Sequence, residues 1–285
     1  MVTQVKNVAL VGASGNLGVV IQNDFLAQLD SPLRVSVLTR QGSDAKFPAG
    51  LNAISTDYSP ASLEQGLRGQ DVVIMFLPPE STVDHETVMD AAVRAVVKRF
   101  FPSDVIDGLL GVDVNTRQVR LYNGGHVPIS TGPRDLAAQA LYTLLTDPER
   151  FEEAKNMYIH VASYTVTQNE ILSVVEKLTG QNWKVENLKS NEVVSEALES
   201  IKNGWNWGLA LQVQAILFDR GSDGHARGDF RPLGIWINKL NLPKSTPEED
   251  PRGPLAGEWK GILHWQPEKL PNYTLKQDIA LGTRL

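Results

Sequence analysis

Three glycines near the start of the chain have the spacing of a turn that binds a dinucleotide. They stand at positions 12, 15 and 18, between the apolar segment 8–11 and a sequence of helical character. The first glycine permits a tight exit from a strand, the second lets the backbone approach a pyrophosphate, and the third lets the helix pack closely. The helix amides then face the anion; a glycine-rich turn without a ligand is the alternative. We expect cofactor contacts from the whole turn, namely Gly12, Ala13, Ser14, Gly15, Asn16, Leu17 and Gly18.

The residue that follows the second expected strand, 34–39, indicates which nicotinamide nucleotide would bind. NAD-specific domains usually place an acid here, on the ribose 2′-hydroxyl, whereas this chain has Arg40, with Lys46 on the same loop. A guanidinium can grip a 2′-phosphate through two parallel hydrogen bonds, and the lysine adds a second positive charge. These residues favour NADP(H) over NAD(H). The alternative is that both are ordinary solvated loop residues.

The composition excludes several classes of protein. The 285 residues include no cysteine, which rules out a disulfide framework, a thiolate metal site and a cysteine nucleophile, and no other metal-ligand spacing is present. A net charge of −6 without a basic stripe argues against nucleic-acid binding but leaves a protein partner open. No apolar run has the length of a membrane span, and residues 1–6 are too short and polar for a signal peptide. We therefore expect a cytoplasmic protein with no membrane contact.

The first hundred residues alternate between strand and helix with short joints. This order predicts an α/β fold, a Rossmann-like doubly wound parallel sheet with a smaller C-terminal α/β lobe. The expected strands are 8–11, 34–39, 52–57, 72–77 and 99–101, and helices are expected after Gly18 and at 62–67 and 85–97. We expect a Rossmann domain over residues 1–155, a small substrate lobe over 156–243 and a proline-rich tail over 244–285. Ligands bind beyond the carboxyl ends of such strands.

Several segments together resemble the NmrA-like / isoflavone reductase-like family, and its fungal members most. The resemblance covers residues 5 to about 243 and is carried by the glycine turn and by the segments 37–40 (VLTR), 57–59 (DYS), 69–73 (GQDVV), 97–103 (VKRFFPS) and 167–171 (TQNEI). It implies a Rossmann domain of the atypical short-chain dehydrogenase kind, a small substrate lobe and NADPH. By position, the glycine turn would bind the pyrophosphate and Arg40 with Lys46 the 2′-phosphate. The turn at Phe76 and Leu77 would border the cofactor.

One part of the family pattern is missing. After Ser103 the family continues with a helix that carries its catalytic lysine and then with another strand, but here no lysine occurs between Lys98 and Lys155. Residues 104–134 contain no amphipathic helix, only a predicted hairpin of 109–114 and 118–122. Because a parallel crossover needs a dozen or more residues, we expect a sheet without a strand beside its fifth. That leaves an open edge.

The sequence does not assign the catalytic role to another residue. None of the six tyrosines has a lysine four positions later, which excludes the pair of ordinary short-chain dehydrogenases. Three histidines remain as candidate proton donors. His85 is expected to open a helix near the cleft, His126 to lie in a turn, and His160 to lie in a strand at 156–160. For each of them the alternative is an ordinary core or solvated histidine. Ser103 and Asp104 follow the fifth strand, where they could be catalytic residues or ordinary turn residues. The catalytic residues therefore stay unassigned.

The chain beyond residue 160 is expected to form the smaller lobe. Thr167 and Glu170 have capping-box spacing before a helix that ends at Gly180. A strand at 183–185 and helices at 192–201 and 207–218 should follow. An aromatic-substrate pocket or simple core packing would both explain the apolar residues Trp205, Trp207, Leu209, Leu211 and Ile216. Beyond Pro243 the density of proline suggests an extended or disordered tail.

Two functions are compatible with these features. The first is an NADPH-dependent reductase of a small carbonyl or enone substrate, phenolic compounds included, as the resemblance implies. The second is a non-catalytic NADP(H)-sensing regulator whose affinity for a protein partner depends on the bound cofactor. The missing lysine favours the second, and the usual activity of the family favours the first.

Overall fold

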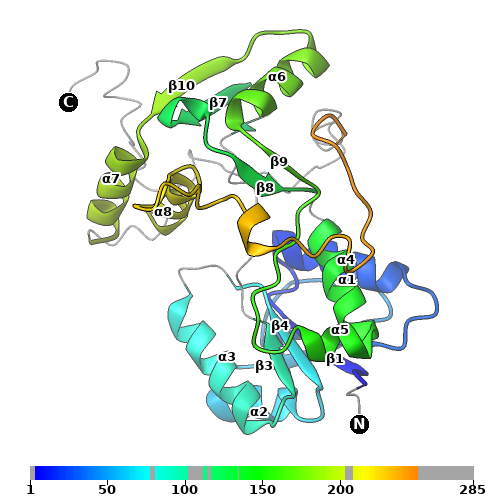
Figure 1. The fold of residues 1–285 in the computed structure, drawn as a ribbon. Coiled ribbons are helices and arrows are strands. Elements are labelled where there is room, and N and C mark those ends of the chain that lie inside the picture. Colours follow the sequence, from blue (N-terminus) through cyan, green and yellow to red (C-terminus); the bar gives the residue numbers. More distant parts are fainter. Residues whose placement is uncertain are drawn as a thin grey trace.

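The computed structural model describes residues 4–77, 81–101, 112–113, 117–133, 135–202 and 208–249. Figure 1 shows two lobes, one built on a parallel sheet with helices on both faces and one of short strands and helices above it. The predicted tail of residues 244–285 lies outside the described residues from position 250 onward, as do Ser103, Asp104, Trp205 and Trp207. None of the described helices is both long and apolar enough to cross a bilayer.

The lower lobe contains a sheet of five parallel strands in the order β3-β2-β1-β4-β5. The strands are β1 (Asn7–Val11), β2 (Arg34–Arg40), β3 (Asn52–Thr56), β4 (Val72–Met75) and β5 (Arg99–Phe101). All four residues of β4 are buried, as its apolar run predicts. The order reverses between β1 and β4, and this switch point is where doubly wound folds bind their ligands.

Helices cover both faces of this sheet (Figure 1). On one face α1 (Asn16–Ala27) and α4 (Asp135–Thr146) pack together around Ile21, Phe25 and Ala138, with α5 (Pro148–Glu153) beside them. On the other face α2 (Pro60–Leu67) and α3 (Thr82–Arg94) bury leucine and alanine side chains against the sheet. The predicted doubly wound α/β fold is confirmed.

Strand β5 is an edge strand of the sheet as far as the described residues show. Within the part of the chain that the structure describes, β5 pairs with β4 alone, in the register Val72 to Arg99. The Arg99 guanidinium lies 3.7 Å from the centre of the Phe151 ring and donates a hydrogen bond to the Phe151 carbonyl, which links this edge to α5. An open edge beside the fifth strand is what the sequence predicts.

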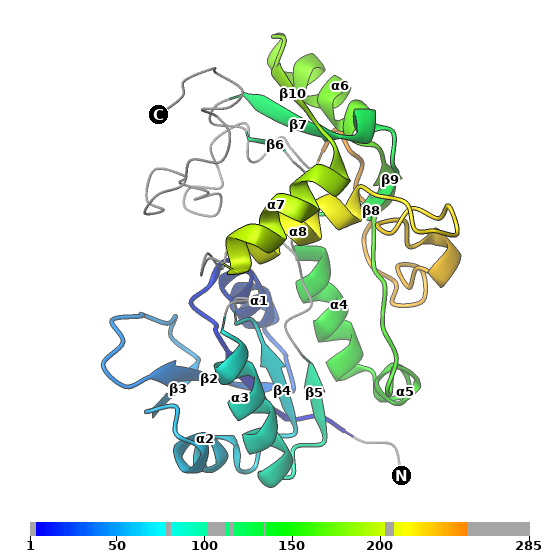
Figure 2. The same cartoon turned by 90° about the vertical axis from the view of Figure 1, so that its left-hand side faces the viewer.

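In the described residues the upper lobe contains two small sheets and the α-helices α6 (Gln168–Thr179), α7 (Ser190–Lys202) and α8 (Gly208–Leu217), arranged as Figure 2 shows. Strand β7 (Gln118–Tyr122) pairs with β6 (Val112–Asp113) in antiparallel fashion, as the predicted hairpin requires, and with β10 (Lys184–Leu188) in parallel. Strands β8 (Ile129–Thr131) and β9 (Tyr164–Val166) form the second sheet.

The two lobes are interleaved along the chain. Strands β6 to β8 belong to the upper lobe, the chain then returns to the lower lobe with α4 and α5, and β9 begins the second passage upward (Figures 1 and 2). Near the end of the described chain, Trp236, Ile237 and Leu240 pack on the outer side of α4. The domain limits proposed at residues 155 and 243 stay predictions.

Local expectations are met at α6 and not at two other places. Thr167 and Glu170 form the capping box, and Gly180 ends the helix with a φ of +64°. The strand expected at 156–160 is wrong: Asn156 has a φ of +56°, which interrupts an extended chain, and His160 forms only an isolated bridge with Ile235. The α3 helix begins at Thr82, three residues before the expected start at 85.

Candidate cofactor site

The glycine turn connects β1 to α1 beside the end of β4. Gly12 has a φ of +81°, and a Cβ atom placed on it would lie 2.9 Å from the carbonyl carbon and oxygen of Phe76. Both the conformation and the space therefore require glycine at this position. The Phe76 amide in turn donates a hydrogen bond of 2.8 Å to the Val11 carbonyl, so the glycine turn and the Phe76–Leu77 segment border each other.

The start of α1 is open to an anion. Gly15 is the N-cap residue, its amide donates a 3.0 Å hydrogen bond to the Gly12 carbonyl, and no side chain caps the helix. The first turn carries no acidic residue, so nothing there opposes a negative charge. A Cβ atom on Gly15 would lie 3.2 Å from the Gly12 carbonyl oxygen and would fill part of the approach to these amides. This backbone geometry fits a pyrophosphate.

The other residues of the turn contribute in different ways. A Cβ atom on Gly18 would come within 2.6 Å of the Ala13 Cα atom, so glycine lets α1 pack directly on the turn. The side chains of Ala13 and Leu17 are buried in the core, so a contact from either residue to a ligand would have to come from its backbone. Ser14 is exposed, and the side chain of Asn16 lies outside the described part.

Arg40 stands at the carboxyl end of β2, next to the glycine turn in the sheet. Val11 pairs with Leu38, so Arg40 lies two residues further along the neighbouring strand. Its Nη2 atom is 2.5 Å from Oδ2 of Asp84, and its Cζ atom lies 3.8 Å from the centre of the Tyr58 ring. Tyr58 has a φ of +62°, and its ring lies against one face of the guanidinium. Lys46 is exposed in the following loop and has no ion pair with any described residue.

Asp84 is a member of this cluster that sequence reasoning missed. It lies in the first turn of α3, 44 positions after Arg40, and no spacing rule connects the two residues. Burial raises the pKa of the Tyr58 hydroxyl, the guanidinium of Arg40 acts to lower it, and the carboxylate of Asp84 raises it again. The three side chains therefore form one electrostatic unit.

The histidines considered as acids lie in three different places. His85 is half-buried in the first turn of α3, next to Asp84 in the sequence. His126 lies in the upper lobe, where its Nδ1 atom is 3.1 Å from Nδ2 of Asn169. The ring of His160 packs on Phe230 at a centroid distance of 4.9 Å. The structure does not bring these histidines together, and no catalytic acid can be assigned among the described residues.

Leu211 and Ile216 do not share a pocket wall. Leu211 is buried in the core of the upper lobe with Tyr122 and Phe218, whose rings stack at 5.6 Å, whereas Ile216 is 37% exposed. Core packing therefore explains Leu211. The side chain of Leu209 lies outside the described part of the chain.

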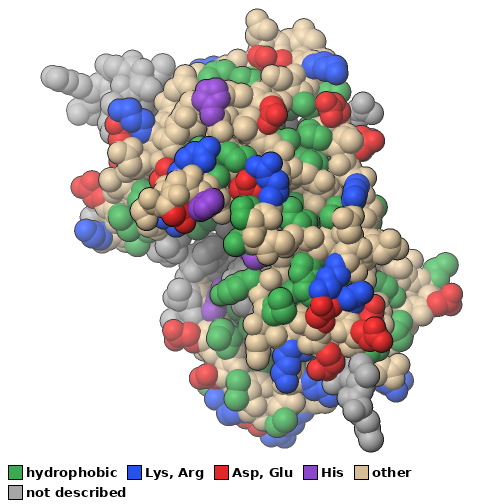
Figure 3. Space-filling view, viewed as in Figure 1, with side chains coloured by type: hydrophobic (Ala, Val, Ile, Leu, Met, Phe, Trp, Pro, Cys, Tyr) green, Lys and Arg blue, Asp and Glu red, His purple; other side chains and the backbone are tan. Residues whose placement is uncertain are grey.

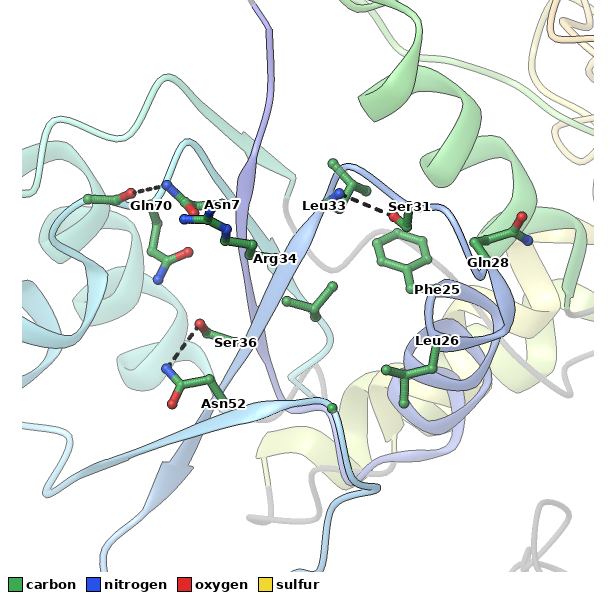
Figure 4. Close-up of a pocket in the computed structure, with 13 residues that line it drawn as sticks. Asn7, Phe25, Leu26, Gln28, Ser31, Leu33, Arg34, Ser36, Asn52 and Gln70 are labelled. Carbon is green, nitrogen blue, oxygen red and sulfur yellow. Dashed lines mark hydrogen bonds between the residues drawn. The ribbon is translucent and has the colours of Figure 1, made fainter.

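A hollow of about 590 Å³ lies at the amino-terminal ends of the strands, on the side of the sheet opposite to the expected cofactor site (Figure 4). It is lined by Asn7, Arg34 and Asn52, which begin β1, β2 and β3, and by Phe25 and Leu26 near the end of α1. The glycine turn and Arg40 stand at the opposite ends of these strands. On that side the molecular surface is indented between the two lobes (Figure 3).

Comparison with known proteins agrees with the fold. Residues 4–123 match the model of the NmrA-like family. Oxidoreductase aprR of Aspergillus flavus is 25% identical over 296 aligned positions, which include 85% of this chain and 96% of the relative. The isoflavone reductase homolog IRL of Zea mays is 27% identical over 259 positions, covering 70% of this chain and 83% of that protein. The alignment with aprR is longer than this whole chain, so the relative contains segments that this chain lacks.

A solved structure of the same architecture is the binary complex of leucoanthocyanidin reductase and NADPH from Vitis vinifera. Its TM-score is 0.65 at 17% identity, and the match covers 85% of this chain and 97% of that chain. At this identity the likeness establishes the fold. The family model over residues 4–123 and the curated relatives support a relationship of this chain to the NmrA-like / isoflavone reductase-like family.

Proposed function

We propose that the chain binds NADP(H) at the glycine turn and reduces a small carbonyl or enone substrate, phenolic compounds included. The observation that carries this proposal is the backbone cradle of Gly12, Gly15 and Gly18 at the open start of α1. The relatives named oxidoreductase and the NADPH complex of a structural neighbour support it.

Different residues would bind different parts of the cofactor. The amides of the turn and of the first turn of α1 would hold the pyrophosphate, and the Phe76–Leu77 segment would border it. Arg40, with Lys46 on the same loop, would hold the 2′-phosphate. The chemistry that a bound NADPH supplies is transfer of a hydride from the nicotinamide C4 atom to the substrate. The substrate would enter from the indentation between the lobes, and we expect neither nucleic acid nor a membrane as a partner.

A second function is a non-catalytic NADP(H) sensor. The absence of lysine between Lys98 and Lys155 favours it, because the family places its catalytic lysine in that part of the chain. Under this alternative the chain would bind a protein partner, and its affinity for that partner would change when NADP(H) binds.

Consumption of NADPH by the purified full chain tests the reductase proposal. The substrates are a panel of aromatic enones, aldehydes and quinones, and the readout is loss of absorbance of the reduced nicotinamide. Sustained turnover supports the reductase and excludes a purely regulatory role. An absence of turnover by a protein that binds NADPH contradicts the reductase and leaves the sensor. If turnover occurs, an unchanged rate in His85→Ala removes that histidine as the acid.

A further inference from the structure

The ion pair between Arg40 and Asp84 has a consequence for nucleotide choice. The carboxylate of Asp84 takes one edge of the guanidinium through Nη2, and the Tyr58 ring lies 3.8 Å from Cζ on one face. The Arg40 side chain is 54% exposed and the Asp84 side chain 30% exposed. An anion that reaches Arg40 from solvent therefore meets a cation whose charge is already shared with a carboxylate.

The guanidinium still has donors to offer. It carries five N–H groups, and the bond to Asp84 is the one hydrogen bond that joins Arg40 to a side chain in the described chain. A 2′-phosphate can bind these remaining donors while the ring of Tyr58 holds the guanidinium plane in place. The phosphate and the carboxylate would then share one cation.

We propose that Asp84 sets the balance between NADPH and NADH at this site. The inference rests on the proposed binding of NADP(H) and adds a residue that opposes it. A carboxylate beside a 2′-phosphate repels that phosphate, because like charges at close range disfavour each other. The same carboxylate can accept a hydrogen bond from the 2′-hydroxyl of NADH, which is the role that an acid plays at the end of β2 in NAD-specific domains. Arg40 therefore favours NADPH, and Asp84 favours NADH.

The position of Asp84 makes this opposition moderate. Both side chains are partly exposed, so solvent and salt reduce the repulsion. We expect removal of the carboxylate charge to tighten NADPH about tenfold, which corresponds to about 1.4 kcal/mol. The affinity for NADH should stay unchanged or fall, because the 2′-hydroxyl is neutral and loses a charged acceptor.

The test compares Asp84→Asn with a matched control on the same helix. Asp90→Asn removes the same charge from an exposed position of α3, six residues and ~9 Å further along the helix axis. The dissociation constants of NADPH and NADH are measured by nucleotide fluorescence on the full chain. Adenosine 2′,5′-bisphosphate and 5′-AMP serve as competitors, because they differ only in the 2′-phosphate.

The expected result is an NADPH to NADH preference about tenfold higher in Asp84→Asn, with a change below twofold in Asp90→Asn. Adenosine 2′,5′-bisphosphate should gain affinity in the same variant, and 5′-AMP should not. If Asp84→Asn binds NADPH but its preference for NADPH over NADH is unchanged, the role of Asp84 is overturned and the proposed function is not. A wild-type chain that binds neither nucleotide overturns the proposed function as well. The ion pair is partly exposed, so its loss should have little effect on stability and the variant should fold.

Discussion

Replacement of Gly18 by alanine tests the close packing of α1 on the glycine turn. In a helix interior this exchange normally stabilises by up to about 1 kcal/mol, because alanine has the higher helix propensity. Here the new Cβ atom would lie 2.6–2.7 Å from backbone atoms of Gly12 and Ala13, which cannot rotate away as a side chain can. Overpacking of this kind costs about 1–3 kcal/mol. We therefore expect Gly18→Ala to lose about 1–2 kcal/mol overall.

Gly66→Ala is the matched control in another helix of the same lobe. Its Cβ atom would meet only side-chain atoms, Ile54 Cγ2 at 3.2 Å and Leu38 Cδ2 at 3.7 Å, and the half-buried Ile54 can shift more easily than a backbone can. We expect this variant to be neutral or slightly more stable. Thermal unfolding followed by circular dichroism measures both, at about 2–4 °C per kcal/mol for a chain of this size. A Tm of Gly18→Ala equal to or above that of Gly66→Ala would refute the packing argument.

Three further changes test other parts of the structure by chemical unfolding. Burial raises the pKa of Asp24, and the nearby Asp135 raises it further, so Asp24→Asn should stabilise the folded chain slightly at pH 7, and this gain should vanish below about pH 4, where the carboxyl is protonated in both states. Burial opposes ionisation of Asp71, but hydrogen bonds from Lys98 and two backbone amides outweigh it and lower its pKa. Its stabilisation should be complete above about pH 4 and lost as the pH falls further, a loss that Asp71→Asn should not show. Thr167→Ala removes the cap of α6 and should cost about 1 kcal/mol, and an unchanged midpoint would contradict the capping box.

The sequence predicts the sheet and the glycine turn because their signals are local. The apolar run 72–77 is long enough to predict a strand buried on both faces, and the three glycines lie within seven residues. The short elements α5, β8 and β9 were not predicted, because three to six residues carry too little periodicity to be recognised. Their stability comes from tertiary packing, which spacing along the chain does not encode.

The partner of Arg40 could not be predicted for a related reason. Asp84 reaches the end of β2 from a helix that follows β4, so their proximity depends on how α3 packs on the sheet. An acid in the first turn of a helix has a simpler explanation as a partner of the helix dipole. The contact between the Tyr58 ring and the Arg40 guanidinium could not be predicted either, because it depends on the left-handed conformation of Tyr58.

Thermal unfolding of the full chain with NADPH, with NADH and without nucleotide tests the central claim most directly. A ligand that binds only the folded state stabilises it by about 2.7 kcal/mol at a hundredfold excess over its Kd. For a chain of this size that raises Tm by roughly 5–10 °C. We predict a clear rise with NADPH and a smaller one with NADH at the same concentration. A Tm that is the same with NADPH and without nucleotide would contradict a cofactor site at the glycine turn.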